Sequence, residues 1–428
     1  MFRLEDYVED ARGCPRCSNC KFIEHIWVKS ARFARQCPIN VRYKFNLYSA
    51  PGLLHSALGV LSNELEFSPK LMDALYKCTL CGACDIRCKR NLDLEILAVI
   101  ETLKARSVEM GKGPAPEHKA VAEKIKKSNN RYGSPHGNRL KWITDDIKIA
   151  TKGKMLYFVG CRSSYVHTKI ARATAKMLNN SSTDFVVSEE ESCCGYPLYS
   201  TGQFDAFQKQ MEHNIEMVKK SGAKIVIMNC AECYKTWKVD YPKFLSKSTD
   251  DMEFKVLHIA EYLEELVKSG NLKLENRVNI KATYHDPCNL GRLSEPWYHW
   301  EGVHKHFGVL EPPKTWRRGD KGIYEQPRDI LKRIPGIEFV EMERARDNSW
   351  CCGAGAEVQD TFKDFALWTA SERLEEAKAA GAEAIISCCP ACEELLSEAV
   401  NASKDGMKVY DMVEIVLQAV SPKNDSGA

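Results

Sequence analysis

The sequence predicts an α/β protein: an α-helical N-terminal domain with two cysteine clusters, followed by two duplicated, cysteine-rich α/β lobes with parallel sheets. Three observations lead to this prediction. After about residue 150, apolar runs of strand length alternate with amphipathic patterns of helix length, as in βα units on a parallel sheet. One cysteine pattern occurs twice in this region. The first part of the chain instead holds two compact cysteine clusters, joined by a segment of mixed helical and turn signals.

Length and composition limit the possible classes of protein. A chain of 428 residues with 44% hydrophobic residues is expected to fold into two or three domains with a real core. The net charge of +3 does not indicate nucleic acid or an anionic membrane as a partner. The start, "MFRLEDYVED", does not resemble a signal peptide, and the apolar runs are far shorter than the ~20 residues of a membrane span. We therefore expect a cytoplasmic protein with no transmembrane segment of its own, at most peripheral to a membrane through a partner.

The first cysteine group is the C-x-x-C-x-x-C of Cys14, Cys17 and Cys20, followed by Cys37-Pro38. The second group is "CTLCGACDIRC", which ends in Cys88. In an intracellular chain, cysteines at such spacings indicate metal ligands or redox groups rather than disulfides. This arrangement is typical of two-cluster bacterial ferredoxins, in which the fourth cysteine of each run serves the other [4Fe–4S] cluster. The expected ligand sets are Cys14, Cys17, Cys20 and Cys88 for one cubane, and Cys78, Cys81, Cys84 and Cys37 for the other.

Two departures from the ferredoxin pattern leave the pairing open. Sixteen residues separate Cys20 from Cys37, and Cys88 is followed by Lys89 rather than proline. Neither departure removes a ligand. C-x-x-C pairs also bind structural zinc, but three closely spaced cysteines in each of two loops favour iron–sulfur clusters.

The connector, residues 109–150, is rich in Gly and Pro and then in charge and turn residues. Its Lys/Arg run is interpreted as a solvated helix face, with a docking surface for an acidic partner as the alternative. The expected divisions of the chain are residues 1–108 for the ferredoxin-like domain, 109–150 for the connector, 151–277 for the first lobe, and 278–428 for the second lobe with an insertion at about 295–326.

The duplication is clearest in two segments, "SGAKIVIMNCAECYKTW" from Ser221 and "AGAEAIISCCPACEELL" from Ala380. Their C-x-x-C pairs are 159 residues apart, and the adjacent-cysteine pairs of "SCCGYP" and "WCCGAG" are 158 apart. The second lobe contains the longer insertion, which is rich in Trp, Tyr and Arg, residue types found at interfaces. The five cysteines of each lobe are Cys161, Cys193, Cys194, Cys230 and Cys233 in the first, and Cys288, Cys351, Cys352, Cys389 and Cys392 in the second.

Five cysteines exceed both the four ligands of a tetrahedral zinc site and the four terminal ligands of a cubane. A disulfide between adjacent cysteines would be strained, because their Cα atoms are only about 3.8 Å apart. The adjacent pair therefore indicates a thiolate that bridges two irons of an opened cluster. Cys388 is left over and aligns with Asn229, so we expect it not to be a ligand.

This pattern resembles the cysteine-rich "CCG" domain of heterodisulfide reductase, and "YHDPCNLGR", "PRDILKRIPG" and "RYGSPHGNR" extend the resemblance. The whole architecture resembles the D subunit of that family, and also glycolate oxidase iron–sulfur subunits and the iron–sulfur subunit of class II benzoyl-CoA reductases. The resemblance implies one or two non-cubane [4Fe–4S] clusters in the lobes, besides the two cubanes. Zinc in one lobe remains an alternative.

The resemblance also implies an oxidoreductase subunit of a multisubunit complex in anaerobic metabolism. Because the sequence has no P-loop or dinucleotide fingerprint, electrons are expected from a partner: a flavoprotein, another iron–sulfur protein or a membrane cytochrome. One hypothesis is that the lobes reduce a disulfide. The other is that the chain only relays electrons, as in a class II benzoyl-CoA reductase or a 2-hydroxy-acid oxidase, and a zinc scaffold is the non-redox alternative.

The sequence does not identify catalytic residues. The candidate substrate-binding clusters are those at Cys193 and Cys194 and at Cys351 and Cys352. His285-Asp286, just before Cys288, is interpreted as a turn pair, with a role in orienting a ligand or donating a proton to sulfur as the alternative.

Overall fold

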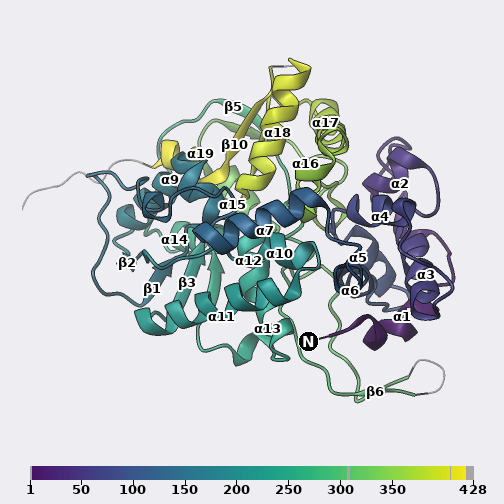
Figure 1. The fold of residues 1–428 in the computed structure, drawn as a ribbon. Helices are drawn as coiled ribbons and strands as arrows, with labels where there is room; N and C mark the ends of the chain where they lie inside the picture. The colour runs from purple at the N-terminus through teal and green to yellow at the C-terminus, as the bar shows by residue number, and fades with distance from the viewer. Residues whose placement is uncertain (1, 306–308, 405, 421–428) are drawn as a thin grey trace, which may run out of the picture.

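The computed structural model describes residues 2–305, 309–404 and 406–420. A helical N-terminal domain lies at one side of the molecule, drawn in purple in Figure 1. Apolar faces of α3 and α6 pack together, with Leu53, Leu54, Val99 and Leu103 fully buried. The helix α4 begins with Pro69 after Ser68, whose hydroxyl accepts a hydrogen bond from the Leu71 N–H. The helices of this domain are α1 (Val8–Arg12), α2 (Pro38–Tyr43), α3 (Ala50–Leu61), α4 (Pro69–Tyr76), α5 (Ala83–Lys89) and α6 (Ile96–Glu109).

The first lobe is built on a four-stranded parallel sheet in the order β2-β1-β3-β4. Parallel neighbours require crossover connections, and the helices between the strands supply them. The strands are β1 (Met155–Tyr157), β2 (Phe185–Val186), β3 (Ile225–Met228) and β4 (Lys255–His258). The helices are α8 (Gly160–Tyr165), α9 (Thr168–Asn180), α10 (Tyr196–Ser200), α11 (Phe204–Ser221), α12 (Ala231–Lys235), α13 (Tyr241–Phe244) and α14 (Ile259–Lys268).

The second lobe repeats this topology. Its sheet, in the order β10-β9-β5-β8, is also parallel throughout, and each strand occupies the position of its counterpart in the first lobe. The register agrees as well, because Tyr157 pairs with Ile227 and Tyr284 pairs with Ile386. The strands are β5 (Ile280–Tyr284), β8 (Ile337–Phe339), β9 (Ala384–Ser387) and β10 (Lys408–Asp411). The helices are α15 (Glu325–Arg333), α16 (Val358–Thr361), α17 (Lys363–Ala379), α18 (Pro390–Ser403) and α19 (Met412–Ala419).

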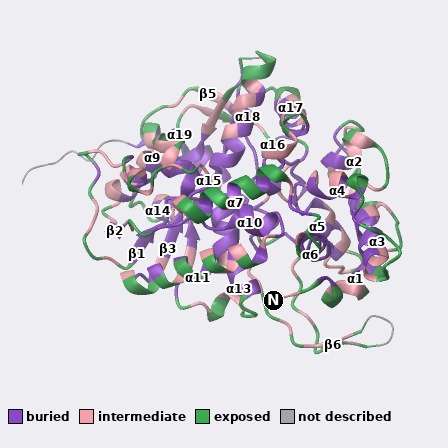
Figure 2. Ribbon diagram, viewed as in Figure 1, coloured by how far each residue is buried: buried purple, intermediate pink, exposed green. Residues whose placement is uncertain are grey.

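The predicted fold class is therefore confirmed, whereas the exact division of the chain into domains stays a prediction. The expected insertion contains an antiparallel pair, β6 (Val303–His304) and β7 (Leu310–Glu311), which extends away from the lobes in Figure 1. The connector forms α7 (Pro116–Ser128), which crosses from the first lobe to the second and contacts α10 and α16. Buried residues run from the helical domain through both sheets (Figure 2).

Candidate iron–sulfur sites

All nineteen cysteines are free thiols, and those of the lobes are buried except Cys288, which is partly buried. The structure places them at two kinds of position. In the N-terminal domain they lie in loops, at helix starts and, for Cys88, at the end of α5. In the lobes they follow the carboxyl ends of strands, where the side chains that end neighbouring parallel strands meet at one edge of the sheet.

The inner N-terminal site combines Cys37, at the start of α2, with the three cysteines of the loop before and within α5. These four thiols line one small internal cavity, which is closed by Ala50, Leu53 and Ile100. Burial raises the pKa of Cys37 well above its ordinary value, and charges on Cys81 and Cys78 add to this effect. Four thiols around one cavity, one buried and three partly buried, fit a group that binds thiolates, such as a [4Fe–4S] cluster. The thiols that line the cavity are Cys37, Cys78, Cys81 and Cys84.

The outer N-terminal site contains Cys14, Cys17, Cys20 and Cys88. Burial raises the pKa of Cys20 to about 12, and the charges on the neighbouring Cys14 and Cys17 add to this effect. Cys88 also has a pKa of about 12, mainly through burial, with Cys20 and Cys14 among the charges that act on it. Cys17 is exposed to solvent, so this site lies nearer the surface than the inner one. The structure thus brings together each of the two predicted sets, and their role as ligands stays a prediction.

In the first lobe, five thiols form a continuous series of hydrogen-bonding contacts. Cys161, after β1, contacts Cys193, and this contact raises the pKa of Cys161. Hydrogen bonds from Cys193 and Cys233 lower the pKa of Cys194 to about 6. Hydrogen bonds with Cys194 and Cys230 in turn raise the pKa of Cys233.

The second lobe repeats this series. Cys288 contacts Cys351, and the contact raises the pKa of Cys288. Hydrogen bonds from Cys351 and Cys392 lower the pKa of Cys352 to about 5, and the Cys352 Sγ lies 3.2 Å from the Cys392 Sγ. Although burial opposes it, hydrogen bonds from the neighbouring thiols hold the pKa of Cys389 well below its ordinary value. In both lobes, then, the second cysteine of the adjacent pair has a lowered pKa, and in the second lobe the pKa values of Cys351 and Cys389 are lowered as well.

A glycine after each adjacent pair allows the chain to turn. Gly195 and Gly353 have φ values of +90° and +97°, in the left-handed region that favours glycine. A Cβ at Gly353 would lie 2.5 Å from the Ala366 carbonyl oxygen, and the Gly353 N–H donates to the Cys351 Sγ at 3.3 Å. Five converging thiols and a backbone N–H aimed at sulfur fit a sulfur-ligated cluster in each lobe better than a tetrahedral zinc ion.

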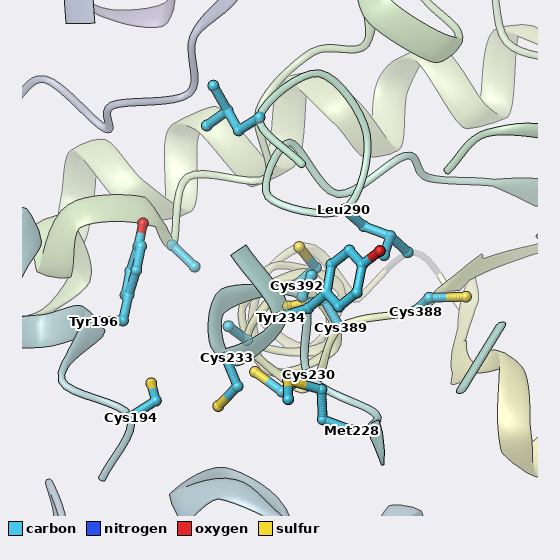
Figure 3. Packing of buried hydrophobic residues seen from close by; sticks show 14 of the residues in the cluster. Cys194, Tyr196, Met228, Cys230, Cys233, Tyr234, Leu290, Cys388, Cys389 and Cys392 are labelled. Carbon is cyan, nitrogen blue, oxygen red and sulfur yellow. The ribbon is translucent and has the colours of Figure 1, made fainter. Parts of the chain in front are cut away.

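The two lobes meet through their cysteines. Cys230 of the first lobe forms a hydrogen-bonding contact with Cys389 of the second. Figure 3 shows Cys230, Cys233, Cys389 and Cys392 gathered in one region, whereas Cys388 points away from them. The Cys388 Sγ instead contacts the Met412 Sδ at 3.5 Å.

The inner N-terminal site also touches the second lobe. The pKa of Cys81 is raised mainly by a hydrogen bond with Cys351. The guanidinium of Arg292 fixes this junction, because its Nε donates to the Cys81 carbonyl oxygen at 2.7 Å. Its Nη1 donates to the carbonyl oxygens of Asp347 and Ser349 at 2.7 and 2.8 Å. The residue spacing gave no signal for this junction or for Arg292.

His285 differs from its counterpart in the first lobe, Phe158, which the strand register places at the equivalent position. The His285 Nδ1 accepts a hydrogen bond from the Arg373 Nε at 3.1 Å, so the proton of the neutral ring resides on Nε2. This Nε2 has no hydrogen-bond partner among the described residues. The ring lies within 4.8 Å of the Cys352 and Cys392 sulfur atoms. Asp286 has a different role, because Arg328 binds its two carboxylate oxygens at 2.6 and 2.9 Å.

The connector also reaches the cysteines. The Cys193 N–H donates to the Asn129 carbonyl oxygen at 2.8 Å, and the Arg139 guanidinium binds the buried carboxylate of Glu191. Arg131 pairs with Glu357 of the second lobe at 2.7 Å. The motif "RYGSPHGNR" therefore lies beside the thiols of the first lobe and bridges to the second, which the sequence did not indicate.

Comparison with known proteins agrees with these sites. A 4Fe-4S dicluster domain family matches residues 10–92, and a cysteine-rich domain family, CCG, matches residues 155–238 and 315–397. These matches define the chain as an iron–sulfur protein with a dicluster domain and two CCG domains.

The family follows from full-length relatives. The chain is 33% identical to the D subunit of the dihydromethanophenazine:CoB–CoM heterodisulfide reductase of Methanosarcina mazei, over 95% of this chain and 93% of that protein. It therefore belongs to the family of heterodisulfide reductase D subunits, as the sequence resemblance predicted. It is also 28% identical to the B subunit of the fumarate reductase (CoM/CoB) of Methanothermobacter marburgensis, over 97% of this chain and 74% of that protein. The EtfAB:quinone oxidoreductase of Syntrophomonas wolfei is 25% identical over 81% of this chain, which spans 47% of its length.

These relatives confirm that the chain is an iron–sulfur oxidoreductase subunit, and they are named as parts of multisubunit redox systems. The number and type of its clusters stay predictions. Within the part of the chain that the structure describes, no helix is both long and apolar enough to cross a membrane.

Proposed function

We propose that this chain accepts electrons from a partner at its N-terminal sites and passes them to the two lobes, where a disulfide is reduced. The cysteines predicted for each site hold the clusters: two cubanes in the N-terminal domain and a non-cubane cluster in each lobe. Clusters bound there supply one-electron steps, whereas reduction of a disulfide consumes two electrons and two protons and yields two thiols. Two lobes suit this two-electron reaction.

The observation that carries the proposal is a series of neighbouring cysteine sites that runs through the molecule. It begins at the exposed Cys17 and the outer site, where Cys20 is among the charges that raise the pKa of Cys84 in the inner site. It continues from the inner site to the second lobe through Cys81 and Cys351. It reaches the first lobe through Cys389 and Cys230. The second lobe is therefore the one that receives electrons first.

The second lobe also carries the group suited to proton chemistry. A ring nitrogen of His285 lies within 4.8 Å of the Cys352 and Cys392 sulfurs, while the first lobe has Phe158 at this position. Arg373 keeps the imidazole oriented and in one tautomer. His285 is then positioned to hold a proton beside the sulfur of a bound substrate.

The second candidate function is an electron relay within a larger complex, such as a class II benzoyl-CoA reductase or a 2-hydroxy-acid oxidase. It is favoured by the burial of the lobe cysteines, since Cys193 and Cys351 are each 2% exposed. In that case the chemistry takes place on another subunit.

The test is the metal content and the EPR spectrum of anaerobically purified protein. Four filled [4Fe–4S] sites require about 16 iron atoms per chain. A paramagnetic signal that depends on added thiol in the oxidised protein supports disulfide reduction, and its loss in His285→Phe with full iron content supports the second lobe as its origin. Full iron without such a signal supports the relay, whereas about 8 iron atoms with zinc refute cluster binding by the lobes.

A further inference from the structure

The segment 12–46, which surrounds the outer N-terminal site, has an unusual charge. It contains eight Lys or Arg residues and one acidic residue, for a net charge of +7, whereas the whole chain carries +3. The rest of the protein is therefore net acidic. Six of the eight basic side chains make no ion pair within the described residues: Arg16, Lys21, Lys29, Arg35, Arg42 and Lys44.

The same segment exposes large apolar side chains. Its small core of Ile23, Val28, Phe33 and Ala34 faces inward. Ile26 and Trp27 remain outside this core, 81% and 59% exposed, and Phe22 is 48% exposed. Phe45 is 62% exposed, and the next residue, Asn46, accepts a hydrogen bond at 2.8 Å from the Nζ of Lys21, the residue before Phe22.

We propose that this basic and aromatic surface, residues 12–46, is the docking site of an acidic electron-carrier protein. The proposal deepens the proposed function, on which it rests for the redox nature of the partner. A positive field attracts an acidic protein and accelerates association, and exposed aromatic side chains supply the apolar centre of an interface. Cys17 lies within the segment and is itself exposed, so a partner docked here is close to the outer site.

The observations favour a protein over a lipid surface. Membrane-surface binding by a soluble segment is typical of an amphipathic helix with one apolar face. Here residues 22–36 form an irregular loop closed by an isolated bridge between Phe22 and Arg35. The loop is also fixed to the second lobe, because the Ser30 N–H donates to the Glu343 carboxylate at 2.9 Å. The surface is thus held against the second lobe and lies around the outer cysteine site, which is where an electron carrier must dock.

The test measures the rate at which a reduced, strongly acidic [2Fe–2S] ferredoxin reduces the iron-loaded, full-length protein. The docking variant combines Lys29→Glu, Arg35→Glu and Lys44→Glu. The matched control makes the same charge change on α7, with Lys119→Glu, Lys126→Glu and Lys127→Glu, all exposed. At low ionic strength we expect the docking variant to react at least about tenfold more slowly than the wild type, and the control within about twofold of it. Added salt should slow the wild type and reduce the difference.

Two further measurements separate the possible failures. Photoreduced lumiflavin, a small neutral reductant, should reduce all three proteins equally, and its failure with the wild type contradicts the proposed function rather than the docking site. Equal ferredoxin rates in the wild type and the docking variant overturn the docking proposal, as does a slower α7 control. Binding of the wild type but not the docking variant to phosphatidylserine vesicles, with equal ferredoxin rates, identifies a membrane surface and also overturns it. Trp27→Ala should lower the ferredoxin rate without changing its salt dependence.

Discussion

Arg292→Met should loosen the junction between the inner N-terminal site and the second lobe. Arg292 is 3% exposed and donates three hydrogen bonds, to the carbonyl oxygens of Cys81, Asp347 and Ser349. These bonds connect the loop of one cysteine site to the loop that precedes the Cys351 pair. A methionine fills much of the same volume but donates no hydrogen bond.

The magnitude follows from the carbonyl groups that lose their donor. Two of them, on Cys81 and Ser349, belong to buried residues, and the third is half-buried. Each buried acceptor left without a partner costs roughly 1–3 kcal/mol of stability. Removing the buried Arg charge recovers its desolvation cost and offsets part of that loss. We therefore expect local docking of the α5 loop to weaken by about 3 kcal/mol. This corresponds to a rise of about 100-fold in the local opening constant.

Amide hydrogen exchange of residues 83–89 measures this opening directly. Exchange there should accelerate about 100-fold in Arg292→Met, while exchange in β1 and β3 of the first lobe stays unchanged. Arg277→Met removes an exposed Arg just before the second lobe and should leave both regions unchanged. Uniform acceleration over the whole chain, or none at α5, would refute a local role for Arg292. Iron content should remain full, since Arg292 is not among the predicted ligands.

Three other outcomes are expected. Gly353→Ala places a Cβ 2.5 Å from a carbonyl oxygen and should lower iron by about four atoms per chain, whereas Gly111→Ala, with open space around it, should keep full iron on metal analysis. Cys388→Ser should retain the iron that Cys352→Ser loses; equal losses would contradict the assignment of Cys388 as a non-ligand. Burial lowers the pKa of His118 to about 4, so the neutral ring contributes about 3 kcal/mol to the free energy of unfolding above pH 6.5. This contribution is lost as pH falls from 6.5 toward 4, because the unfolded chain binds the proton first. A His118→Gln variant should show a flatter decline of melting temperature over this range, and an identical decline would be evidence against it.

The duplication and the alternation of strands and helices could be predicted from the sequence because both patterns are local and periodic. Tyr157 and Tyr284 occupy equivalent positions, and their hydroxyls contact Asn229 and Cys388, the two residues that the sequence alignment paired. Spacing, together with the two-cluster ferredoxin pattern, also grouped the cysteines that the structure brings together. The junctions between the N-terminal domain and the lobes could not be predicted in this way. The contact of Cys81 with Cys351 depends on how separate units dock, and docking is decided by side chains such as Arg292 that are far apart in sequence.

The contact between Cys230 and Cys389 has a symmetry that bears on the history of the chain. The two residues are equivalent positions of the repeat, so the lobes meet through the same patch on each. An interface in which equivalent residues face one another is the kind that a twofold homodimer forms. The present chain has the organisation of such a dimer whose two halves have been joined end to end. Fusion removes the constraint that both halves share one sequence. Phe158 and His285 are equivalent positions at which the two halves now carry different residues.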